Sequence, residues 1–395
     1  MREEVNNKLL NNNKEKYFKI LQKKRNWILL LVPLSFIILL LVRSNSDISE
    51  YVFARGIYKV LSQILSNVTG IVPFSIMEIM ILLIPIISII MIGQFIYKLI
   101  KNVYQKEKNT GAILLTAFIN LLCVVSIFFF MFTIFAGTNY YRYPFAKISG
   151  LKVRESSVDE LYELTLSLAK EASIIREEIQ ELGMYEDEYG VLMAKEDGFN
   201  DLSNKANEIF NVASKKYTVF SGKYGKAKPV FFSKFMSRME TTGIFWPFTM
   251  EANVNVHASY YSIPATIAHE IAHQRGFMRE DEANFIAYLV TSESDDLLFQ
   301  YSGIMLALNY ASNQLYRNDV DLYYAVLDHY NEGMLVDLRD EYYYWKQFED
   351  TVISTVSSTM NDTYLKANNQ NDGIKSYGRM VDLLLAKYRS DNNIE

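Results

Sequence analysis

The sequence predicts a mainly α-helical membrane protein in which three membrane-spanning helices precede a larger α+β domain with a small sheet. Three observations predict this class. Three long apolar runs fall within the first 136 of the 395 residues. The remainder has the ordinary composition of a water-soluble domain, and it is long enough to bury a core of its own.

The three apolar runs are expected to cross a membrane as helices at about 27–42, 72–97 and 112–136. The first run, "WILLLVPLSFIILLLV", has sixteen residues and is close to the lower limit for crossing the hydrocarbon core. A cleavable signal peptide is the alternative for this run, but "RSNSDISEY" after it lacks a small-residue cleavage site. Buried core helices are the alternative for the other two runs, and their length and lack of charge disfavour it.

Lysine and arginine residues flank these runs unevenly, and this asymmetry predicts the orientation. Residues 1–25 hold eight of them and the short loop after the second run holds four, whereas the longer loop between the first two runs holds three. We therefore expect a basic cytoplasmic tail at 1–25, a membrane domain at 26–136 and an exterior domain at 137–395, on a bacterial cell membrane. The single cysteine, Cys123, excludes an intrachain disulfide.

The charge of residues 137–395 narrows the class of partner. This part of the chain holds 25 Lys and Arg against 38 Asp and Glu, a net charge of −13. Such an acidic domain is a poor match for nucleic acid. The lipid bilayer is the partner that the apolar runs predict, and the oligomeric state is left open.

The sequence makes specific predictions for two features of the membrane domain. Apolar residues at helical spacing between about 50 and 68 predict an exterior amphipathic helix that lies on the outer leaflet or packs on the spans. Glu78 lies inside the second apolar run, where a carboxylate is by default a candidate functional group. Ser75 precedes it by three residues, however, and this capping-box spacing favours a helix start near the outer interface.

The exterior domain is expected to be mostly helical. Helical periodicity covers 156–182 and 200–216, with "GMYEDEYG" as a loop between them. The best strand candidates are "KPVFFSKFMS" and "FTMEANVNV". From Pro264 onward the sequence predicts helices almost throughout, including a core-like helix over "YYYWKQFEDTVISTVSSTM".

The stretch "PATIAHEIAHQRGF" carries the clearest chemical signal. His269 and His273 are four residues apart on an expected helix, so both imidazoles lie on one face and could hold one zinc ion. Glu270 follows the first histidine by about 100° round the helix, beside the metal, where it could accept a proton from water that the metal activates. This H-E-x-x-H pattern is typical of zinc hydrolases.

A catalytic zinc needs three protein ligands and one open position. Gly276 is expected to end the helix, and Arg279, three residues later, cannot bind a metal. The third ligand should therefore be a carboxylate, and "REDEANFIAYL" offers Glu280, Asp281 and Glu282.

These residues resemble the gluzincin-type metallopeptidases, whose third ligand is a glutamate on a following helix. The chain is more closely similar to an uncharacterised bacterial membrane family, defined by a domain of unknown function, with three N-terminal spans and an exterior H-E-x-x-H domain. The similar stretches are "NYYRYP", "FWPFTMEANVN", "HEIAHQRGFMREDEANF" and "YLKANNQNDGIKSYGRM". The resemblance implies a zincin-like fold in which His269, His273 and Glu282 hold zinc and Glu270 is the general base.

The three acidic residues are then expected to have different roles. Asp281 would cap the second helix, and Glu280 would precede this cap and point to solvent near Arg279. Glu282 would lie in the first helical turn, where the small Ala283 and Ala287 allow a close approach to the zinc helix.

Other candidates have weaker support. His257, Tyr377 and Arg379 could stabilise the negative charge that develops on a substrate carbonyl, or they could be ordinary surface and interface residues. "FTMEANVNVHASYY" could be an edge strand that pairs with a substrate backbone, or a core strand.

The function that the sequence favours is a membrane-anchored zinc metallopeptidase that hydrolyses peptide bonds of a peptide or protein at the outer surface. One alternative is a non-catalytic membrane scaffold with a structural metal site. In that case a fourth protein ligand, for example His257 or Glu251, would close the site. The other alternative is a zinc amidase that acts on cell-wall peptides.

Overall fold

A computed structural model describes residues 15–107, 109–183, 186–193, 198–370 and 379–394. The chain forms two compact units. The first unit comprises residues 1–45 and 79–138, and the second comprises 46–78 and 139–395. Part of the predicted basic tail, residues 1–14, lies outside the described residues.

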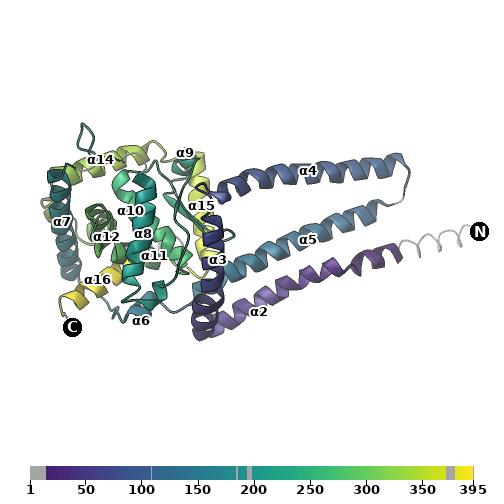
Figure 1. Ribbon diagram of the computed structural model, residues 1–395, viewed down its shortest axis with the longest axis horizontal. Coiled ribbons are helices and arrows are strands. Elements are labelled where there is room, and N and C mark those ends of the chain that lie inside the picture. Colours follow the sequence, from purple (N-terminus) through teal and green to yellow (C-terminus); the bar gives the residue numbers. More distant parts are fainter. Residues whose placement is uncertain (1–14, 108, 184–185, 194–197, 371–378, 395) are drawn as a thin grey trace, which may run out of the picture. The chain divides into compact units, whose positions relative to one another are not determined.

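Three helices are long and apolar enough to cross a membrane: Lys24–Ser44, Ile76–Tyr104 and Thr110–Phe135. They belong to the first unit, apart from residues 76–78 at the start of the second helix. The first is a 3-10 turn, η1 (Lys24–Leu30), that continues as α2 (Leu31–Ser44). The other two are α4 and α5, labelled in Figure 1. Their apolar side chains are largely exposed, as expected of helices whose surroundings are lipid. The three predicted spans are therefore present as helices.

The start of α4 confirms the expected cap. The backbone N–H of Glu78 donates to Ser75 Oγ at 3.3 Å, and the Glu78 carboxylate accepts the N–H groups of Phe231 and Phe232. Glu78 belongs to the second unit. It is a structural carboxylate at a helix start.

The second unit is mainly helical. Its first elements are the π-helix η2 (Ile48–Tyr58), α3 (Lys59–Thr69), the 3-10 helix η3 (Gly137–Tyr141) and α6 (Phe145–Ser149). The middle of the unit holds α7 (Val158–Glu181), α8 (Gly198–Ala213), the 3-10 helix η4 (Thr218–Phe220), α9 (Ser233–Arg238) and the 3-10 helix η5 (Tyr260–Ser262). The remaining helices are α10 (Ile263–Gln274), α11 (Glu280–Ser292), α12 (Leu297–Asn318), α13 (Val320–Leu327), α14 (Glu332–Lys346), α15 (Val352–Ala367) and α16 (Arg379–Asp391).

The core of this unit is built around α12. This helix packs against α7, α10, α11 and α16, and its apolar side chains are buried on several sides (Figure 1). A helix that is apolar on more than one face is stable in water only when other helices surround it. The arrangement gives α10 and α11 a rigid support.

The sheet has three short strands in the order β1–β3–β2. β1 (Lys228–Pro229) and β3 (Glu251–Val254) lie within the two predicted strand segments, whereas β2 (Gly243–Trp246) was not predicted. β3 is the central strand and is fully buried, so the alternative of an ordinary core strand is correct for it. The edge that faces α10 is β2.

The segment predicted as one amphipathic helix differs from expectation. It is divided between η2 and α3, and it is part of the second unit. Its polar face is buried, through Ser62 and Ser66, while Val60, Ile64 and Val68 are exposed. Serine hydroxyls on this face hydrogen-bond to backbone groups of the second unit, which explains why the polar side faces inward.

The single core-like helix predicted over 342–360 is also wrong. α14 ends at Lys346, and α15 begins at Val352 after Thr351, which caps it with a capping box. Threonine competes for backbone hydrogen bonds and therefore favours a helix start over a helix interior. Much of this stretch is exposed, with Tyr343 at 65% and Val352 at 81%.

Candidate metal centre

The centre is built on α10, whose two ends are well defined. Pro264 lies in its first turn, where proline costs no hydrogen bond. At the other end, the N–H of Gly276 donates to His273 O and the N–H of Phe277 donates to Ala272 O. This is a Schellman motif, which needs a left-handed residue after the helix, and Gly276 has φ +89°. The predicted helix end is therefore confirmed.

The turn after α10 leaves no room for a side chain at Gly276. A Cβ atom there would lie 3.1 Å from the ring of Tyr58 and 3.4 Å from the Arg142 guanidinium. Tyr58 donates its hydroxyl to His273 O at 2.8 Å, and Arg142 donates to Gly276 O at 3.1 Å. Arg142 comes from the "NYYRYP" stretch, so this motif braces the end of the helix that carries both histidines.

Three side chains converge beside this turn. The Nε2 atoms of His269 and His273 are 3.0 Å apart. The Glu280 carboxylate, from the first residue of α11, lies 3.2 Å from His269 Nε2 and 3.5 Å from His273 Nε2. Among the described residues, these three form a group that could hold a metal ion.

The orientation of His273 is fixed by a second contact. Its Nδ1 lies 2.6 Å from Phe277 O, so Nδ1 carries the proton and donates it to this carbonyl. Nε2 is then available as a ligand atom, as in metal sites whose histidines donate their other ring N–H to a backbone carbonyl. The turn that ends α10 thus also sets the direction of the ligand.

The distances fit a tetrahedral metal. Ligand atoms about 2.1 Å from a tetrahedral zinc ion are about 3.4 Å from one another. Here the two Nε2 atoms are 3.0 Å apart, and Glu280 places Oε2 3.2 Å from His269 Nε2 and Oε1 3.5 Å from His273 Nε2. Two imidazoles and one carboxylate are also a donor set that zinc accepts. The residues present therefore fit a zinc ion.

The charges of His273 and Glu280 strongly affect each other's pKa. Burial opposes the charged form of His273, but the facing Glu280 carboxylate outweighs it and raises the pKa of His273 to about 9. Burial likewise opposes the charged form of Glu280, yet His273 and His269 hold the pKa of this carboxyl well below its usual range. The negative charge of Glu280 is therefore balanced either by a protonated histidine or by a cation that takes the place of this proton.

Glu270 lies beside the cluster and is 3% exposed. Burial raises its pKa to about 7, against the opposing effect of the two histidines. The backbone N–H of Phe245 in β2 donates to the carboxylate, and Oε2 meets no hydrogen-bond donor among the described residues. A Cβ atom at Gly243 would lie 2.3 Å from Glu270 Oε1, so only glycine lets the edge strand pass this close.

The structure places Glu280 and Glu282 differently from the sequence-based prediction. Glu280 was expected to point to solvent, but it faces the histidines. Glu282 was expected there, but its Oε1 accepts the N–H of Phe145 at 2.7 Å and the guanidinium of Arg279 at 2.6 Å. The reason is that α11 begins earlier than predicted, directly after Arg279. Residues two apart on a helix differ by about 200°, so Glu280 and Glu282 lie on opposite faces.

Asp281 is not the helix cap that the sequence predicted. The residue before α11 is Arg279, and no side chain caps this helix. The Asp281 carboxylate accepts from Arg379 Nε at 3.0 Å instead. Arg379 is thereby held beside Asp281, the residue that follows Glu280, and its side chain is 39% exposed.

The remaining candidates lie elsewhere. His257 is exposed on the turn after β3 and is not part of the cluster. Glu251 accepts the N–H groups of Ile76 and Met77 and pairs with Lys228, so it is engaged away from the histidines. Tyr377 lies outside the described residues.

One further residue near the cluster had no signal in the sequence. Tyr310 in α12 is partly buried, and burial together with the charge of Glu280 raises its pKa. Asn284 donates to its hydroxyl at 3.0 Å. A tyrosine within an apolar helix is typical of core packing, so only the folded structure reveals that the charge of Glu280 acts on this phenol.

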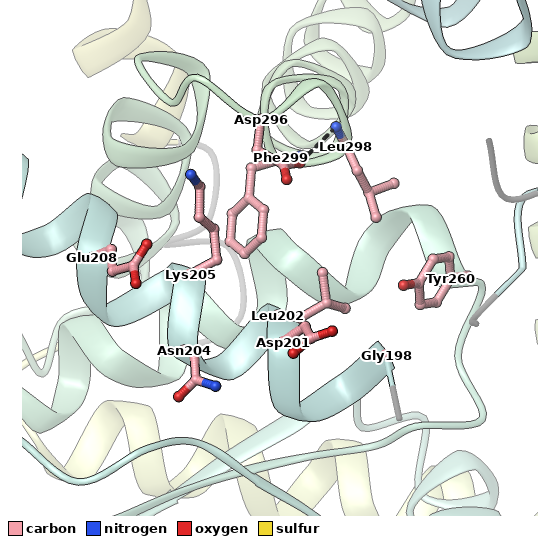
Figure 2. A pocket seen from close by; sticks show the side chains of 10 residues that line it. All are labelled: Gly198, Asp201, Leu202, Asn204, Lys205, Glu208, Tyr260, Asp296, Leu298 and Phe299. Carbon is pink, nitrogen blue, oxygen red and sulfur yellow. Dashed lines mark hydrogen bonds between the residues drawn. The ribbon is translucent and has the colours of Figure 1, made fainter. Parts of the chain in front are cut away.

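A separate hollow of about 400 Å³ lies between α8 and the start of α12 (Figure 2). None of the sequence-predicted site residues lines it. Its polar groups have structural roles, since Asp296 accepts the N–H groups of Leu298 and Phe299 and Lys205 pairs with Asp295. Its lining begins at Gly198, next to residues outside the described part of the chain.

Comparison with known protein families gives one match. Residues 53–385 match the family described as "Protein of unknown function (DUF3810)". The chain belongs to this family. The matched region includes α4, α5 and the candidate ligands His269, His273 and Glu280, whereas the first apolar helix, Lys24–Ser44, precedes it. Two of the three predicted spans and the candidate metal centre therefore occur within one family match. A search of the curated proteins and a search of the solved structures found no match.

Proposed function

We propose that the protein is a membrane-anchored zinc metallopeptidase of the gluzincin type, with the ligands His269, His273 and Glu280. Glu280 takes the place that the sequence assigned to Glu282. One observation carries the proposal: two imidazoles and one carboxylate, with ligand atoms within 4.8 Å of one another, lie beside the buried carboxylate of Glu270, which is not one of the three.

The residues of the chain divide the chemistry among them. When bound, zinc supplies a Lewis acid that lowers the pKa of water to about 7. Glu270 is the general base, because a carboxylate with a pKa of about 7 both accepts and returns a proton near neutral pH. His273 is held in one tautomer by Phe277 O, and Glu280 supplies the negative charge of the ligand set.

The edge strand β2 supports a peptide as the substrate. Within the described sheet, β2 pairs on one side only, with β3. An extended peptide can add to such an edge through backbone hydrogen bonds. Because Gly243 and Phe245 of this strand contact Glu270, a peptide bound there would lie next to the base.

The number of ligands favours catalysis over a structural metal site. A structural zinc site is closed by four protein ligands, whereas a catalytic site keeps one position open. The described residues provide three, and the two candidates for a fourth, His257 and Glu251, do not join them. A zinc amidase that acts on cell-wall peptides would use the same residues and remains the alternative substrate class.

We further propose that the second unit lies outside the cell, as the flanking Lys and Arg residues predict. Three crossings from a cytoplasmic N-terminus place residues after the third span outside. A C-terminal reporter that works only in the cytoplasm should therefore be silent, and an active reporter would refute this orientation.

Zinc content of two matched variants tests the proposed ligands. Glu280→Gln and Glu282→Gln each neutralise one carboxylate in the first turn of α11. We expect purified Glu280→Gln to lose zinc binding, because glutamine removes a charged ligand. Glu282→Gln should retain zinc and lose about 1–3 kcal/mol of stability, since it weakens the hydrogen bonds to Phe145 and Arg279.

Hydrolysis of fluorescently labelled casein by the full-length protein in detergent, with and without a chelator, tests the activity itself. Retention of full zinc by Glu280→Gln together with loss by Glu282→Gln would refute the proposed ligand set. Zinc-dependent binding without chelator-sensitive hydrolysis of casein or of cell-wall peptides would favour the structural metal site.

A further inference from the structure

A cavity of about 260 Å³ in the second unit collects cationic side chains. It lies between η2, the start of α3, the segment after η4, and the turn that ends α10. Four of its nine lining residues are basic: Arg55, Lys59, Arg142 and Arg275. The cavity is also lined by the hydroxyl-bearing residues Thr218, Ser221 and Tyr224.

Arg275 is the unusual member of this set. It is 3% exposed, and none of its three guanidinium nitrogens meets a hydrogen-bond acceptor among the described residues. Its guanidinium carbon lies 4.5 Å from the ring centre of Phe210 and 4.3 Å from that of Tyr224. The two rings hold the charge by cation–π contact but accept none of its N–H groups. A buried guanidinium normally has an anion as partner.

The other cations leave the cavity positive. Arg55 and Arg142 share the single carboxylate of Glu50. Lys59 donates to Ser221 Oγ at 2.8 Å, a neutral partner. Burial lowers the pKa of Lys59, and the charges of Arg55 and Arg275 lower it further, which shows that the cations act on each other. Among the described residues, Glu50 is the only carboxylate paired with these four cations.

We propose that this cavity is a binding site for a phosphate group, with Arg275 and Lys59 as its principal contacts. A guanidinium presents N–H donors in a fork that matches two phosphate oxygens. A phosphate monoester or a free phosphate carries nearly two negative charges at neutral pH, and it therefore offsets the excess positive charge better than a carboxylate does.

Two sources could supply this phosphate: a lipid headgroup or a soluble phosphate compound. The lining residues Arg55 and Lys59 stand on η2 and α3, whose outer side exposes Ile57, Val60 and Ile64. This apolar side would suit a bilayer surface, so a lipid headgroup could supply the phosphate. The recognition chemistry at Arg275 is the same for both.

The test is the thermal unfolding of the full-length protein in detergent with added potassium phosphate. A chelator is present throughout, so that phosphate cannot act through a metal, and potassium chloride of equal ionic strength is the reference. We expect phosphate to raise Tm in a dose-dependent way, by about 2–4 °C. Arg275→Met should abolish this response and Lys59→Gln should weaken it, whereas Lys215→Gln, an exposed lysine outside the cavity, should retain it.

The stability of Arg275→Met in chloride gives a second measurement, which does not depend on any ligand. Replacing a buried charge that lacks a partner by an apolar side chain of similar length is neutral or stabilising, so the variant should remain folded in chloride. Reconstitution into phosphatidylcholine discs with and without phosphatidic acid identifies the source. A rise in Tm with phosphatidic acid alone indicates a headgroup, and a rise with inorganic phosphate indicates a soluble compound. Equal responses of the wild type and Arg275→Met, or no response to either probe, would overturn the proposal.

Discussion

His273 of the candidate metal centre and Arg275 of the cationic cavity are two residues apart in the chain, yet the two regions suit ions of opposite charge. At the cluster, the Glu280 carboxylate faces two imidazoles that can give up their protons. At the cavity, Arg275 faces two aromatic rings and cannot give up its charge at neutral pH, although burial lowers its pKa to about 10. The first arrangement is suited to a cation and the second to an anion.

The difference shows what the turn after α10 does. His273 is in the last turn of the helix, and Arg275 is its C-terminal flanking residue. The left-handed Gly276 reverses the chain there, with Tyr58 and Arg142 packed against it. His273 joins the ligand cluster and Arg275 lines the cavity, so two charged regions of opposite kind depend on one glycine turn.

The largest expected effect is on the rate of hydrolysis, which should depend on the candidate metal centre and not on the cavity. Glu270→Gln should lower hydrolysis about 10²- to 10⁴-fold, because an amide cannot accept the proton that a carboxylate accepts. Zinc content should stay at the wild-type level, since Glu270 lies beside the three ligands. The Tm response to phosphate should also be unchanged. Rates with casein and metal analysis of the same preparation measure the first two.

The matched control for this variant is Glu282→Gln, which alters a buried carboxylate on the far face of α11. Its rate per zinc-loaded molecule should remain near that of the wild type. Undiminished hydrolysis by Glu270→Gln would remove Glu270 from the mechanism, and loss of zinc from it would make Glu270 a ligand.

Much of the fold could be predicted from local patterns. Hydrophobic runs and helical periodicity predicted the three apolar helices and the helices α7 and α8. A single glycine, Gly276, predicted the end of α10. β2 was missed because "GIFW" is short and its pairing with β3 is a tertiary contact. The burial of Ser62 and Ser66 was missed because hydrophobicity alone does not show that hydroxyls can satisfy backbone groups of another segment.

For the candidate site, local patterns predicted the positions of the two histidines but not that of the carboxylate. His269 and His273 are fixed by spacing within one helix, and the structure brings their Nε2 atoms together. Glu280 and Glu282 were exchanged because the choice depended on where α11 begins. A shift of the helix start by two residues corresponds to a rotation of about 200°, which changes the carboxylate that faces the histidines. Arg275 and Tyr310 carried no signal, since their roles arise only from what packs around them.

A smaller effect is expected on the free energy of unfolding, whose pH dependence should arise from His273 and not from Arg275. The folded pKa of His273, about 9, lies above its unfolded value of 6.5, so its contribution to stability is present below pH 6.5 and lost as the pH rises through 9. Arg275 keeps its charge over most of this window. We therefore expect the free energy of unfolding of the zinc-free protein to fall by about 1–3 kcal/mol between pH 6.5 and 9.

Chemical denaturation in the presence of a chelator measures this slope. His273→Gln should flatten it, and Arg275→Met should leave it in place. Saturating zinc should also remove it, because the metal binds the neutral ring and takes over the role of the proton. An equal slope in wild type and His273→Gln would assign the pH dependence to other groups.

The smallest expected effect concerns Asp281, which lies between the two glutamates that differ most in role. If Asp281 capped α11, Asp281→Asn would be nearly neutral, because asparagine and aspartate cap helices equally well. Its carboxylate instead pairs with Arg379, whose side chain is 39% exposed, so solvent screens the pair. Asp281→Asn should then cost about 0.2–1 kcal/mol, and the cost should shrink in high salt. Arg379→Gln should show the same loss, and the double variant should add little to either. Denaturation at two salt concentrations decides between the roles, and a neutral Asp281→Asn at low salt would restore the cap.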